Sequence, residues 1–521
     1  MGGTTQLWQL PATTLSSMLA QGEVSALEVL RAHFGRIEQV DSRIHAFTEV
    51  LHQRARADAD ASDARRKRGE ARGPLDGIPV SVKECFDVEG RATTLGIPSW
   101  KGRIAERDAA MVTLLRDAGA VVFGRTNLSQ TMLYIEARNP LFGQTANPWS
   151  ADHTPGGSSG GEAAAIASGM SPLGVGTDIG GSIRTPCHFS GICGIKPSLD
   201  RLPMRGYRSV LVGQEAVRGM GGPMARTVGD LALFFGALDS RKMYALDSRV
   251  PPIAWEEPSS VKLEGLCVGT YVDDGVIPAS RAIARATQRA AETLRAQGCA
   301  VRGFRLPDVR AMLASYLGAL SADDGAAIFE ALAGGEIDPV LEPMKRLASV
   351  PLNVRRMMAR AAQALGQPNF ALMLGAMGAK SAAELWRLTG LLRDYRVALL
   401  DSMDRLGVDV LLCPPLATPA LVHGASKNFT LASSYAIVFN GAQLPAGVVP
   451  VTRVREGETQ RAKSRDSLER RAAEVDARSV GLPVGVQVVA RPWKDHVALA
   501  VMAAIEAGVS RDVGFPATPV E

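Results

Sequence analysis

Apolar positions change their spacing along the chain, and the change separates helical from strand-rich segments. Between residues 12 and 70 they recur at helical spacing, and Ser25 with Glu28 three positions later forms the pattern of a capping box. From about residue 74, short apolar runs such as 78–83 and 120–124 alternate with helical stretches. This alternation predicts an α/β fold with a central mixed β-sheet of many strands, covered by helices on both faces.

The same patterns divide the chain into two regions. Residues 1–73 are predicted to form an N-terminal helical region, and residues 74–521 one large domain with a mostly helical insertion at about 240–430. The charged, apolar-poor stretch 453–478 is predicted to be an exposed excursion between two core strands. Strand patterns after the insertion lie at 408–412, 446–451 and 484–489.

Composition narrows the class of protein. Of 521 residues, 46% are hydrophobic and 21% charged, which is ordinary for a soluble globular enzyme. The net charge of +5 is too small and too evenly spread to indicate a nucleic-acid partner. The six cysteines show no metal-ligand spacing, so neither a metal nor disulfides are expected. No apolar run long enough to span a bilayer and no signal-peptide pattern is present, which predicts a cytoplasmic protein.

Two glycine-serine elements carry the candidate chemistry. Ser158 lies in the run Pro-Gly-Gly-Ser-Ser-Gly-Gly at 155–161, and Ser182 ends the run Gly-Thr-Asp-Ile-Gly-Gly-Ser at 176–182. Lys83 ends an apolar strand far upstream. Two serines in glycine-rich turns with one lysine behind them indicate acyl transfer without histidine. The chain is therefore interpreted as an amide hydrolase.

A serine hydroxyl becomes a good nucleophile only when a base accepts its proton. Lys83 can act as that base only in its neutral form, which burial favours because it lowers the pKa of an amine. In this arrangement Ser158 bridges Lys83 and Ser182 and relays the proton. The glycines around Ser158 and Ser159 permit an unusual backbone there, such as a cis peptide.

The second glycine run offers a site for a developing negative charge. The backbone N–H groups of Ile179, Gly180, Gly181 and Ser182 can converge on an oxyanion. Asp178 and Arg184 flank this turn, and their positions fit an orienting role as well as a simple surface ion pair.

Plainer interpretations exist for each piece. The run 156–161 alone resembles a linker, but it lies between Asn-Pro-Trp at 147–149 and an Ala-rich helix. Lys83 alone would be taken for a solvated lysine. His153 and His188 flank the motifs and raise the alternative of a Ser-His site, which would leave the second serine-glycine run unexplained.

Taken together, Lys83, the Gly-Gly-Ser-Ser-Gly-Gly run and Gly-Thr-Asp-Ile-Gly-Gly-Ser-Ile-Arg resemble the amidase signature family. The resemblance covers about residues 74–225 and implies an α/β fold around a mixed sheet. It also implies Lys83 as the base, Ser158 as a bridging serine after a cis peptide, and Ser182 as the acylated nucleophile. Backbone amides from Ile179 to Ser182 would form the oxyanion hole, and no cofactor is implied.

Within that family the chain is most similar to the fatty acid amide hydrolases. The likeness extends beyond the catalytic block to 139–149, 444–452 and 479–493. It implies that Met132 offers a backbone contact to the substrate amide and that Leu133 lines an acyl channel. Leu133 replaces an aromatic residue, and the N-terminal membrane span of the mammalian enzymes is absent, so the acyl chain length stays open.

One segment invites a membrane interpretation. Residues 338–380 intersperse Met and Leu with Lys and Arg, and by position they resemble the cap by which fatty acid amide hydrolases sit on bilayers. A basic amphipathic helix can lie in the interface, here at the inner face of a membrane. The alternatives are a lid helix packed on its own domain and a homodimer contact.

The leading hypothesis is a serine hydrolase that cleaves acyl amides, from fatty acid amides or N-acyl amines, to a carboxylic acid and an amine. Its partner would be a small-molecule amide with a lipid-like acyl chain. Alternatives within the fold are an amidase for small aryl or aliphatic amides and an amidotransferase A subunit. Outside enzymes, the alternative is a catalytically inactive lipid-binding module.

Overall fold

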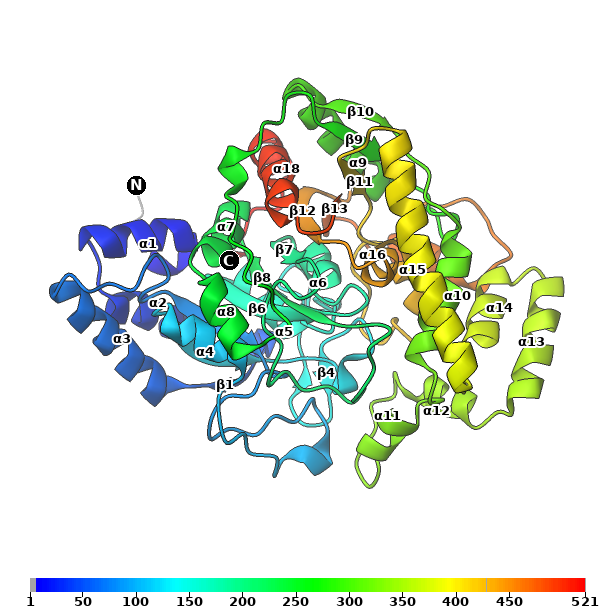
Figure 1. Cartoon of the computed structure of the whole chain (residues 1–521), viewed down its shortest axis with the longest axis horizontal. Coiled ribbons are helices and arrows are strands. Elements are labelled where there is room, and N and C mark those ends of the chain that lie inside the picture. The colour runs from blue at the N-terminus through cyan, green and yellow to red at the C-terminus, as the bar shows by residue number, and fades with distance from the viewer. Residues whose placement is uncertain (1–5, 428, 521) are drawn as a thin grey trace.

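One large sheet organises the molecule. The computed structural model describes residues 6–427 and 429–520, and within them eleven strands form one mixed sheet (Figure 1). In spatial order the strands are β1 (Phe47–Val50), β3 (Val121–Thr126), β2 (Pro79–Lys83), β6 (Leu173–Asp178), β8 (Met220–Ala225), β7 (Cys193–Lys196), β12 (Ala446–Arg453), β13 (Pro483–Ala490), β11 (Val410–Cys413), β9 (Cys267–Thr270) and β10 (Ala300–Gly303).

The sheet is parallel in two blocks and antiparallel elsewhere. Strands β3, β2 and β6 run parallel to one another, as do β11, β9 and β10. The strands between these blocks pair antiparallel, and so does the edge strand β1 with β3. A separate two-stranded ribbon joins β4 (Arg138–Asn139) to β5 (Gly143–Gln144). The predicted mixed α/β sheet of many strands is confirmed.

Most of the regular secondary structure outside the strands is α-helical. The α-helices of the described residues are α1 (Ala12–Gln21), α2 (Ala26–Ile44), α3 (His52–Lys67), α4 (Ala110–Asp117), α5 (Gly160–Ala167), α6 (Arg184–Ser190), α7 (Val228–Gly236), α8 (Ser240–Leu246), α9 (Arg281–Ala296), α10 (Val309–Leu320), α11 (Ala326–Ala331), α12 (Glu342–Ala348), α13 (Leu352–Ala364), α14 (Pro368–Ala376), α15 (Ala382–Arg405), α16 (Ser434–Gly441), α17 (Ser467–Asp476) and α18 (Asp495–Val509).

Side-chain alternation in β12 explains why both faces of the sheet are covered. Val448 packs in a buried cluster with residues of α5 and α6. Its neighbours Val449 and Val451 belong to the large core that also contains residues of α9 and α18. Because successive side chains of a strand point to opposite faces, the valines of this one strand contribute to two cores.

The same alternation aims Lys83. In β2, Val80 and Val82 belong to the large core. Ser81 and Lys83 point to the other face, where Ser81 contacts Glu162 of α5. All five residues of the strand are buried, so the lysine amine is delivered to the interior between the sheet and α5.

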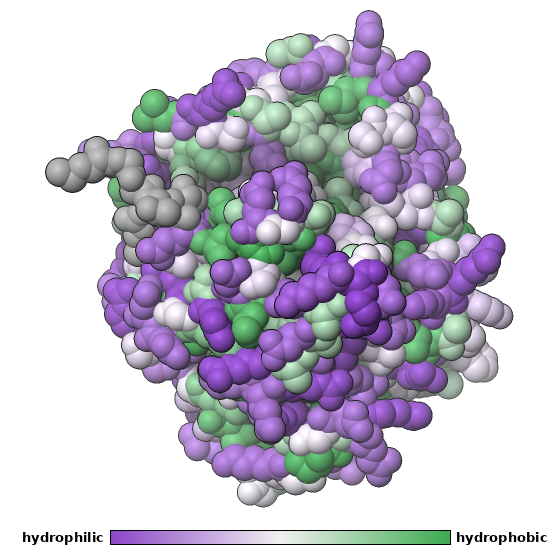
Figure 2. All heavy atoms as spheres, turned by 90° about the vertical axis from the view of Figure 1, so that its left-hand side faces the viewer, coloured by the Kyte–Doolittle hydropathy of each residue, from purple (hydrophilic) through white to green (hydrophobic). Residues whose placement is uncertain are grey.

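The N-terminal region carries helices and one strand of the main sheet. Ser25 caps α2, and a capping box with Glu28 is present as predicted. Strand β1 then pairs with β3 at the edge of the sheet, and the charge-rich stretch after residue 52 forms α3. Figure 2 shows the side of the molecule where these helices lie, and the surface there is largely hydrophilic. The division of the chain at residue 73 stays a prediction.

The region around 240–430 is mostly helical, and it also supplies β9, β10 and β11 to the sheet. Helix α10 contacts α14, α15 and α16, and α13 packs on α14. In Figure 1 helices α10 to α15 lie on the side of the sheet opposite to α1, α2 and α3. This helical group borders the candidate site from one side.

Candidate active site

The structure brings Lys83 and Ser158 into direct contact. Lys83 is fully buried, and its Nζ lies 2.6 Å from Ser158 Oγ. The same Nζ lies 2.9 Å from Oγ1 of Thr177, a residue of β6 that no local sequence pattern marks as a partner of the lysine. Two hydroxyl groups therefore fix the position of the amine, and the alternative of a solvated Lys83 is excluded.

Burial also changes the acid-base behaviour of this lysine. Loss of water around the amine lowers the pKa of Lys83 to about 8, although Cys85, Asp178 and Glu162 act in the opposite direction. An amine with this pKa is half neutral at about pH 8, whereas an ordinary lysine is almost fully charged there. Lys83 can therefore accept a proton from a neighbouring hydroxyl.

A buried carboxyl group lies behind the lysine. Glu162 in the first turn of α5 accepts hydrogen bonds from the hydroxyls of Ser81 and Thr126, the latter at 2.7 Å. Burial raises the pKa of Glu162 to about 7, even though these hydroxyls and Lys83 lower it. Ser81, Glu162 and Lys83 thus belong to one buried polar network. Sequence gave no signal for the glutamate beyond its place after the glycine run.

The backbone around Ser158 lies against the second serine. The Gly157–Ser158 peptide is cis, as the resemblance implied. Gly157 has no room for a side chain, since a Cβ there would lie 2.4 Å from the carbonyl oxygen of Glu136. The N–H of Ser159 donates to the carbonyl oxygen of Ser182 at 3.2 Å. The two glycine-serine elements therefore adjoin, while a bond between the Ser158 and Ser182 hydroxyls stays a prediction.

Asp178 organises the second glycine turn. Its carboxylate accepts hydrogen bonds from the N–H groups of Gly181 at 2.8 Å and Ile183 at 3.1 Å. Arg184 forms a bidentate ion pair with it, through Nε at 3.0 Å and Nη2 at 2.9 Å. Both side chains are fully buried, so the surface-pair alternative is excluded and the orienting one is favoured.

Further buried groups complete this ion pair. Burial alone would raise the pKa of Asp178, but Arg184 and Asn440 hold it well below its usual range. Arg184 also donates to Gln487 Oε1 at 2.7 Å and to the carbonyl oxygen of Ala436 at 2.9 Å. Asn440 and Gln487 come from α16 and β13, and no local sequence pattern marks either one, because they lie some 250 to 300 positions away from Arg184 in the chain.

Three of the four candidate oxyanion donors remain available. The Gly181 N–H is engaged by Asp178. Within residues 6–427 and 429–520, the N–H groups of Ile179, Gly180 and Ser182 donate to no protein acceptor. Ser182 itself is only 8% exposed. Gly181 therefore shapes the turn rather than sharing in a cradle of four equivalent donors.

Met132 lies in an unusual backbone conformation at the end of a short 3₁₀ turn, Gln130–Met132. Its φ is +64°, and its N–H donates to the carbonyl oxygen of Ser129 at 2.9 Å. Any backbone contact of Met132 with a substrate amide must therefore use its carbonyl oxygen, which accepts an N–H.

The flanking histidines have structural partners. His188 accepts from the N–H of Gly485 at 3.0 Å through Nδ1, while its Nε2 lies 3.2 Å from the carbonyl oxygen of Thr418. Burial lowers its pKa to about 4. His153 Nδ1 lies 2.8 Å from Ser150 Oγ. These contacts fix both rings, which argues against the Ser-His alternative.

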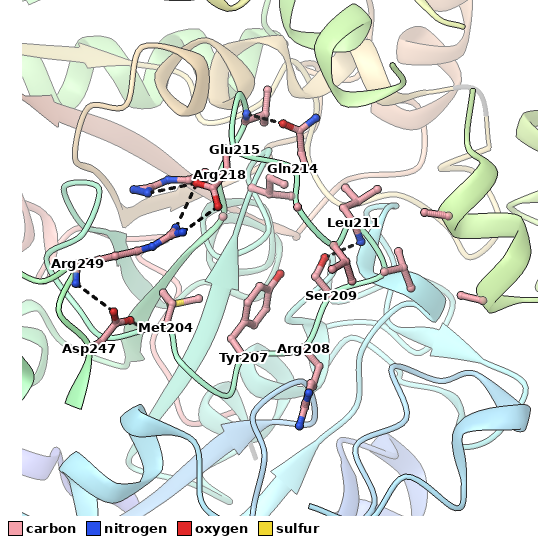
Figure 3. A pocket seen from close by; sticks show the side chains of 18 of the residues that line it. Met204, Tyr207, Arg208, Ser209, Leu211, Gln214, Glu215, Arg218, Asp247 and Arg249 are labelled. Carbon is pink, nitrogen blue, oxygen red and sulfur yellow. Dashed lines mark hydrogen bonds and ion pairs between the residues drawn. The ribbon is translucent and has the colours of Figure 1, made fainter. Parts of the chain in front are cut away.

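A large polar cavity opens beside the glycine turn. It has a volume of about 830 Å³, and Ile179 contributes to its wall. Figure 3 shows charged residues of both signs around it, including Arg218 and Arg249 close to Glu215. The space is suited to a polar, partly hydrated group.

A second cavity is small and mostly apolar. Its volume is about 110 Å³, and its wall includes Leu133 together with residues of α10, α11, α12 and α14. Leu211 lines both cavities, so the polar and apolar spaces adjoin there. Methionines Met344, Met373 and Met377 form part of the apolar wall, and their unbranched side chains can adapt to a guest.

The segment 338–380 faces partly inward. Met344 and Leu347 line the apolar cavity. Arg355 is 2% exposed and pairs with Asp324 at 2.7 Å, so it is not available to lipid headgroups. Met357, by contrast, is 64% exposed. In the part of the chain that the structure describes, every helix is too short or too polar to cross a bilayer.

Comparisons with known proteins fit this geometry. A family model described as Amidase matches residues 28–499. The chain belongs to the amidase signature family. Fatty-acid amide hydrolase 1 of Sus scrofa is 37% identical over 506 residues, which is 96% of this chain and 86% of the relative. The amidase is also 31% identical over 504 residues to fatty acid amide hydrolase 1 of Caenorhabditis elegans, covering 95% and 87% of the two chains.

A solved structure shows the same architecture. A fatty acid amide hydrolase superposes on the amidase with a TM-score of 0.84 and 28% sequence identity, covering 98% of this chain and 87% of the other. The mixed eleven-stranded sheet is thus the amidase-signature fold, and the chain is an amidase-signature hydrolase.

Replacing Asp178 by Asn tests the buried ion pair. We expect Asp178→Asn to lose about 3–5 kcal/mol of stability, because the fully buried Arg184 would keep its charge without a counterion. Denaturant midpoints would measure the loss. Glu70→Gln is the matched control, since Glu70 pairs with Arg68 at the exposed surface and should change stability by less than about 0.5 kcal/mol. Equal midpoints for the two variants would contradict the assignment.

Proposed function

We propose that this amidase hydrolyses acyl amides with lipid-like acyl groups through an acyl-enzyme on Ser182. The observation that carries the proposal is the fully buried Lys83 amine 2.6 Å from Ser158 Oγ, next to the turn that ends at Ser182. A serine, a relay hydroxyl and a base with a lowered pKa are the parts that acyl transfer requires.

Acylation uses these groups in order. Neutral Lys83 accepts the hydroxyl proton of Ser158, and Ser158 accepts the hydroxyl proton of Ser182. At the same time Ser182 Oγ attacks the amide carbonyl carbon. The carbonyl oxygen becomes an oxyanion, which free N–H groups at Ile179, Gly180 and Ser182 stabilise. Collapse of this intermediate breaks the C–N bond, and the proton returns through Ser158 to the leaving nitrogen.

Deacylation repeats the relay with water. Water attacks the ester carbonyl carbon and gives up a proton through Ser158 to Lys83. The Ser182 oxygen leaves and takes the proton back, which releases the carboxylic acid and restores the starting state. The polar cavity beside Ile179 offers the amine and water a hydrated space.

The acyl preference is inferred from the apolar cavity. Leu133 and the apolar side chains of α10, α11 and α12 enclose it, and the polar cavity adjoins it at Leu211. An amide with an apolar acyl group and a polar amine matches the two spaces. The names of the relatives that align along nearly the whole chain point the same way.

A comparison of oleamide with benzamide as substrates, without any partner subunit, distinguishes the alternative functions. An amidase for small amides would prefer benzamide to oleamide, and an amidotransferase A subunit would require partner subunits for activity. A catalytically inactive lipid-binding module would hydrolyse neither substrate.

The pH dependence of covalent labelling tests the proposed base without assuming a substrate. A fluorophosphonate should label Ser182, and its second-order rate constant should rise about tenfold per pH unit below pH 8 and level off above it. The sign follows from the lowered pKa of Lys83, because only the neutral amine accepts the Ser182 proton through Ser158.

Two variants accompany this measurement. Ser182→Ala should take up no label, and Lys83→Ala should react at least about 100-fold more slowly without the pH-dependent rise. A labelling rate in the wild type that stays flat from pH 6 to 9 would count against Lys83 as the base. A label on another serine would remove Ser182 as the nucleophile.

A cavity-filling substitution tests the acyl site. Leu320 of α10 lines the apolar cavity, and Leu320→Trp should lower kcat/KM for long-chain amides at least tenfold while changing it less than twofold for acetamide. The loss of contact with two methylene groups is worth about 1.6 kcal/mol. Leu406→Trp is the control, since Leu406 is exposed at the end of α15. Equal losses for both amides would place the acyl chain elsewhere.

We further propose that the outer face of α13 and the chain after it binds lipid surfaces reversibly. Met357 and Leu365 are 64% and 76% exposed, and Arg356 and Arg360 lie exposed close by in the chain. Apolar insertion and attraction to anionic headgroups would act together there. A homodimer contact through the same face is the alternative.

Vesicle flotation separates these outcomes. Wild type should float with phosphatidylglycerol vesicles, and Met357→Glu combined with Leu365→Glu should abolish flotation. Val513→Glu is the control, because Val513 is also an exposed apolar residue but lies near the C-terminus, far from α13 in the chain. No flotation of the wild type, together with a dimer that the double variant dissociates, would support the homodimer instead.

A further inference from the structure

Tyr316 of α10 reaches from the helical region to the glycine turn. Its side chain is 2% exposed, and its hydroxyl donates a hydrogen bond to the carbonyl oxygen of Ile179 at 2.6 Å. Burial raises the pKa of Tyr316, so the phenol stays protonated and keeps this proton to donate. The bond joins residues 137 positions apart.

The bond fixes more than one atom of the turn. The carbonyl of Ile179 and the N–H of Gly180 belong to the same peptide unit, which is planar. In a trans peptide the C=O and N–H bonds point in opposite directions. Holding the Ile179 oxygen toward Tyr316 therefore holds the Gly180 N–H away from α10.

The absence of a side chain at Gly180 leaves room for this contact. A Cβ on Gly180 would lie 3.2 Å from the Tyr316 hydroxyl oxygen, closer than side chains normally pack. Glycine thus lets the phenol approach the peptide from that side. The sequence showed a glycine at 180, and the structure supplies this specific reason for it.

The Gly180 donor matters more because its neighbour is engaged. The Gly181 N–H donates to Asp178, whereas that of Gly180 donates to no protein acceptor within the described residues. Asp178 holds one side of the turn and Tyr316 the other. Between these two anchors, the orientation of the Gly180 N–H is set before a substrate arrives.

We propose that Tyr316 is a positioning residue that aims the Gly180 N–H at the oxyanion, an inference that rests on the proposed acyl-transfer function. Its helix also contributes Leu317 and Leu320 to the apolar cavity. One helix thus shapes the acyl site and holds the donor that stabilises the transition state.

The variant Tyr316→Phe removes the hydroxyl and keeps the ring. We expect kcat/KM for a long-chain amide to fall about 10- to 100-fold through kcat, with KM changed less than twofold, because loss of a whole oxyanion donor costs about 100- to 1,000-fold. Affinity for a trifluoromethyl ketone of the same chain, which forms a tetrahedral adduct, should fall by the same factor. Affinity for the matching alcohol, which forms no adduct, should not change.

Tyr435→Phe is the matched control. Tyr435 is a buried tyrosine whose hydroxyl lies 3.0 Å from the carbonyl oxygen of Val272 and 2.9 Å from that of Ile277, and it bonds to no atom of the glycine turn within the described residues. The Tyr435→Phe variant should lose about as much thermal stability as Tyr316→Phe, and its kcat/KM should stay within about twofold of the wild-type value.

The outcomes are distinct. Wild-type kcat/KM in Tyr316→Phe overturns the inference, and so does a parallel loss of affinity for the ketone and the alcohol, which would indicate a general structural role. Wild type that hydrolyses no amide and forms no ketone adduct overturns the proposed function, and the inference with it.

Discussion

The burial of one amine governs the chemistry of this protein. Lys83 is placed at the end of a strand whose alternate valines lie in the large core, and its side chain is fully buried. Water is replaced around the amine by hydroxyl groups of Ser158 and Thr177. Removing water disfavours the charged form of the amine. The fold therefore lowers the pKa of Lys83 from the value of a solvated lysine to about 8.

A second buried charge shapes the neighbouring turn. Asp178 and Arg184 neutralise each other, and Asn440 and Gln487 provide the additional hydrogen bonds that a buried ion pair needs. The aspartate uses its remaining acceptor capacity on backbone N–H groups, among them that of Gly181. The glycine turn is therefore held from inside the protein, and its other amides remain free for chemistry.

The helical region connects the apolar cavity to this turn. Its helices enclose the apolar cavity, and α10 also reaches the turn through Tyr316. The inward orientation of Met344, Leu347 and Arg355 shows that the basic, methionine-rich segment builds the cavity as well as offering an outer face. Composition alone did not separate these two roles, because both use the same residue types.

The sequence by itself determined the strand and helix pattern, the capping box at Ser25, the two glycine-serine elements and the candidate lysine, since each is encoded by near neighbours in the chain. Tertiary structure alone decided which distant groups meet. Thr177 reaches Lys83 because β6 pairs with β2, and Asn440, Gln487 and Tyr316 reach the glycine turn from segments more than 130 positions away. It also decided that Arg355 is buried while Met357 is exposed. Local periodicity specifies which face of an element is apolar, but the order of strands and the packing of helices determine what that face meets.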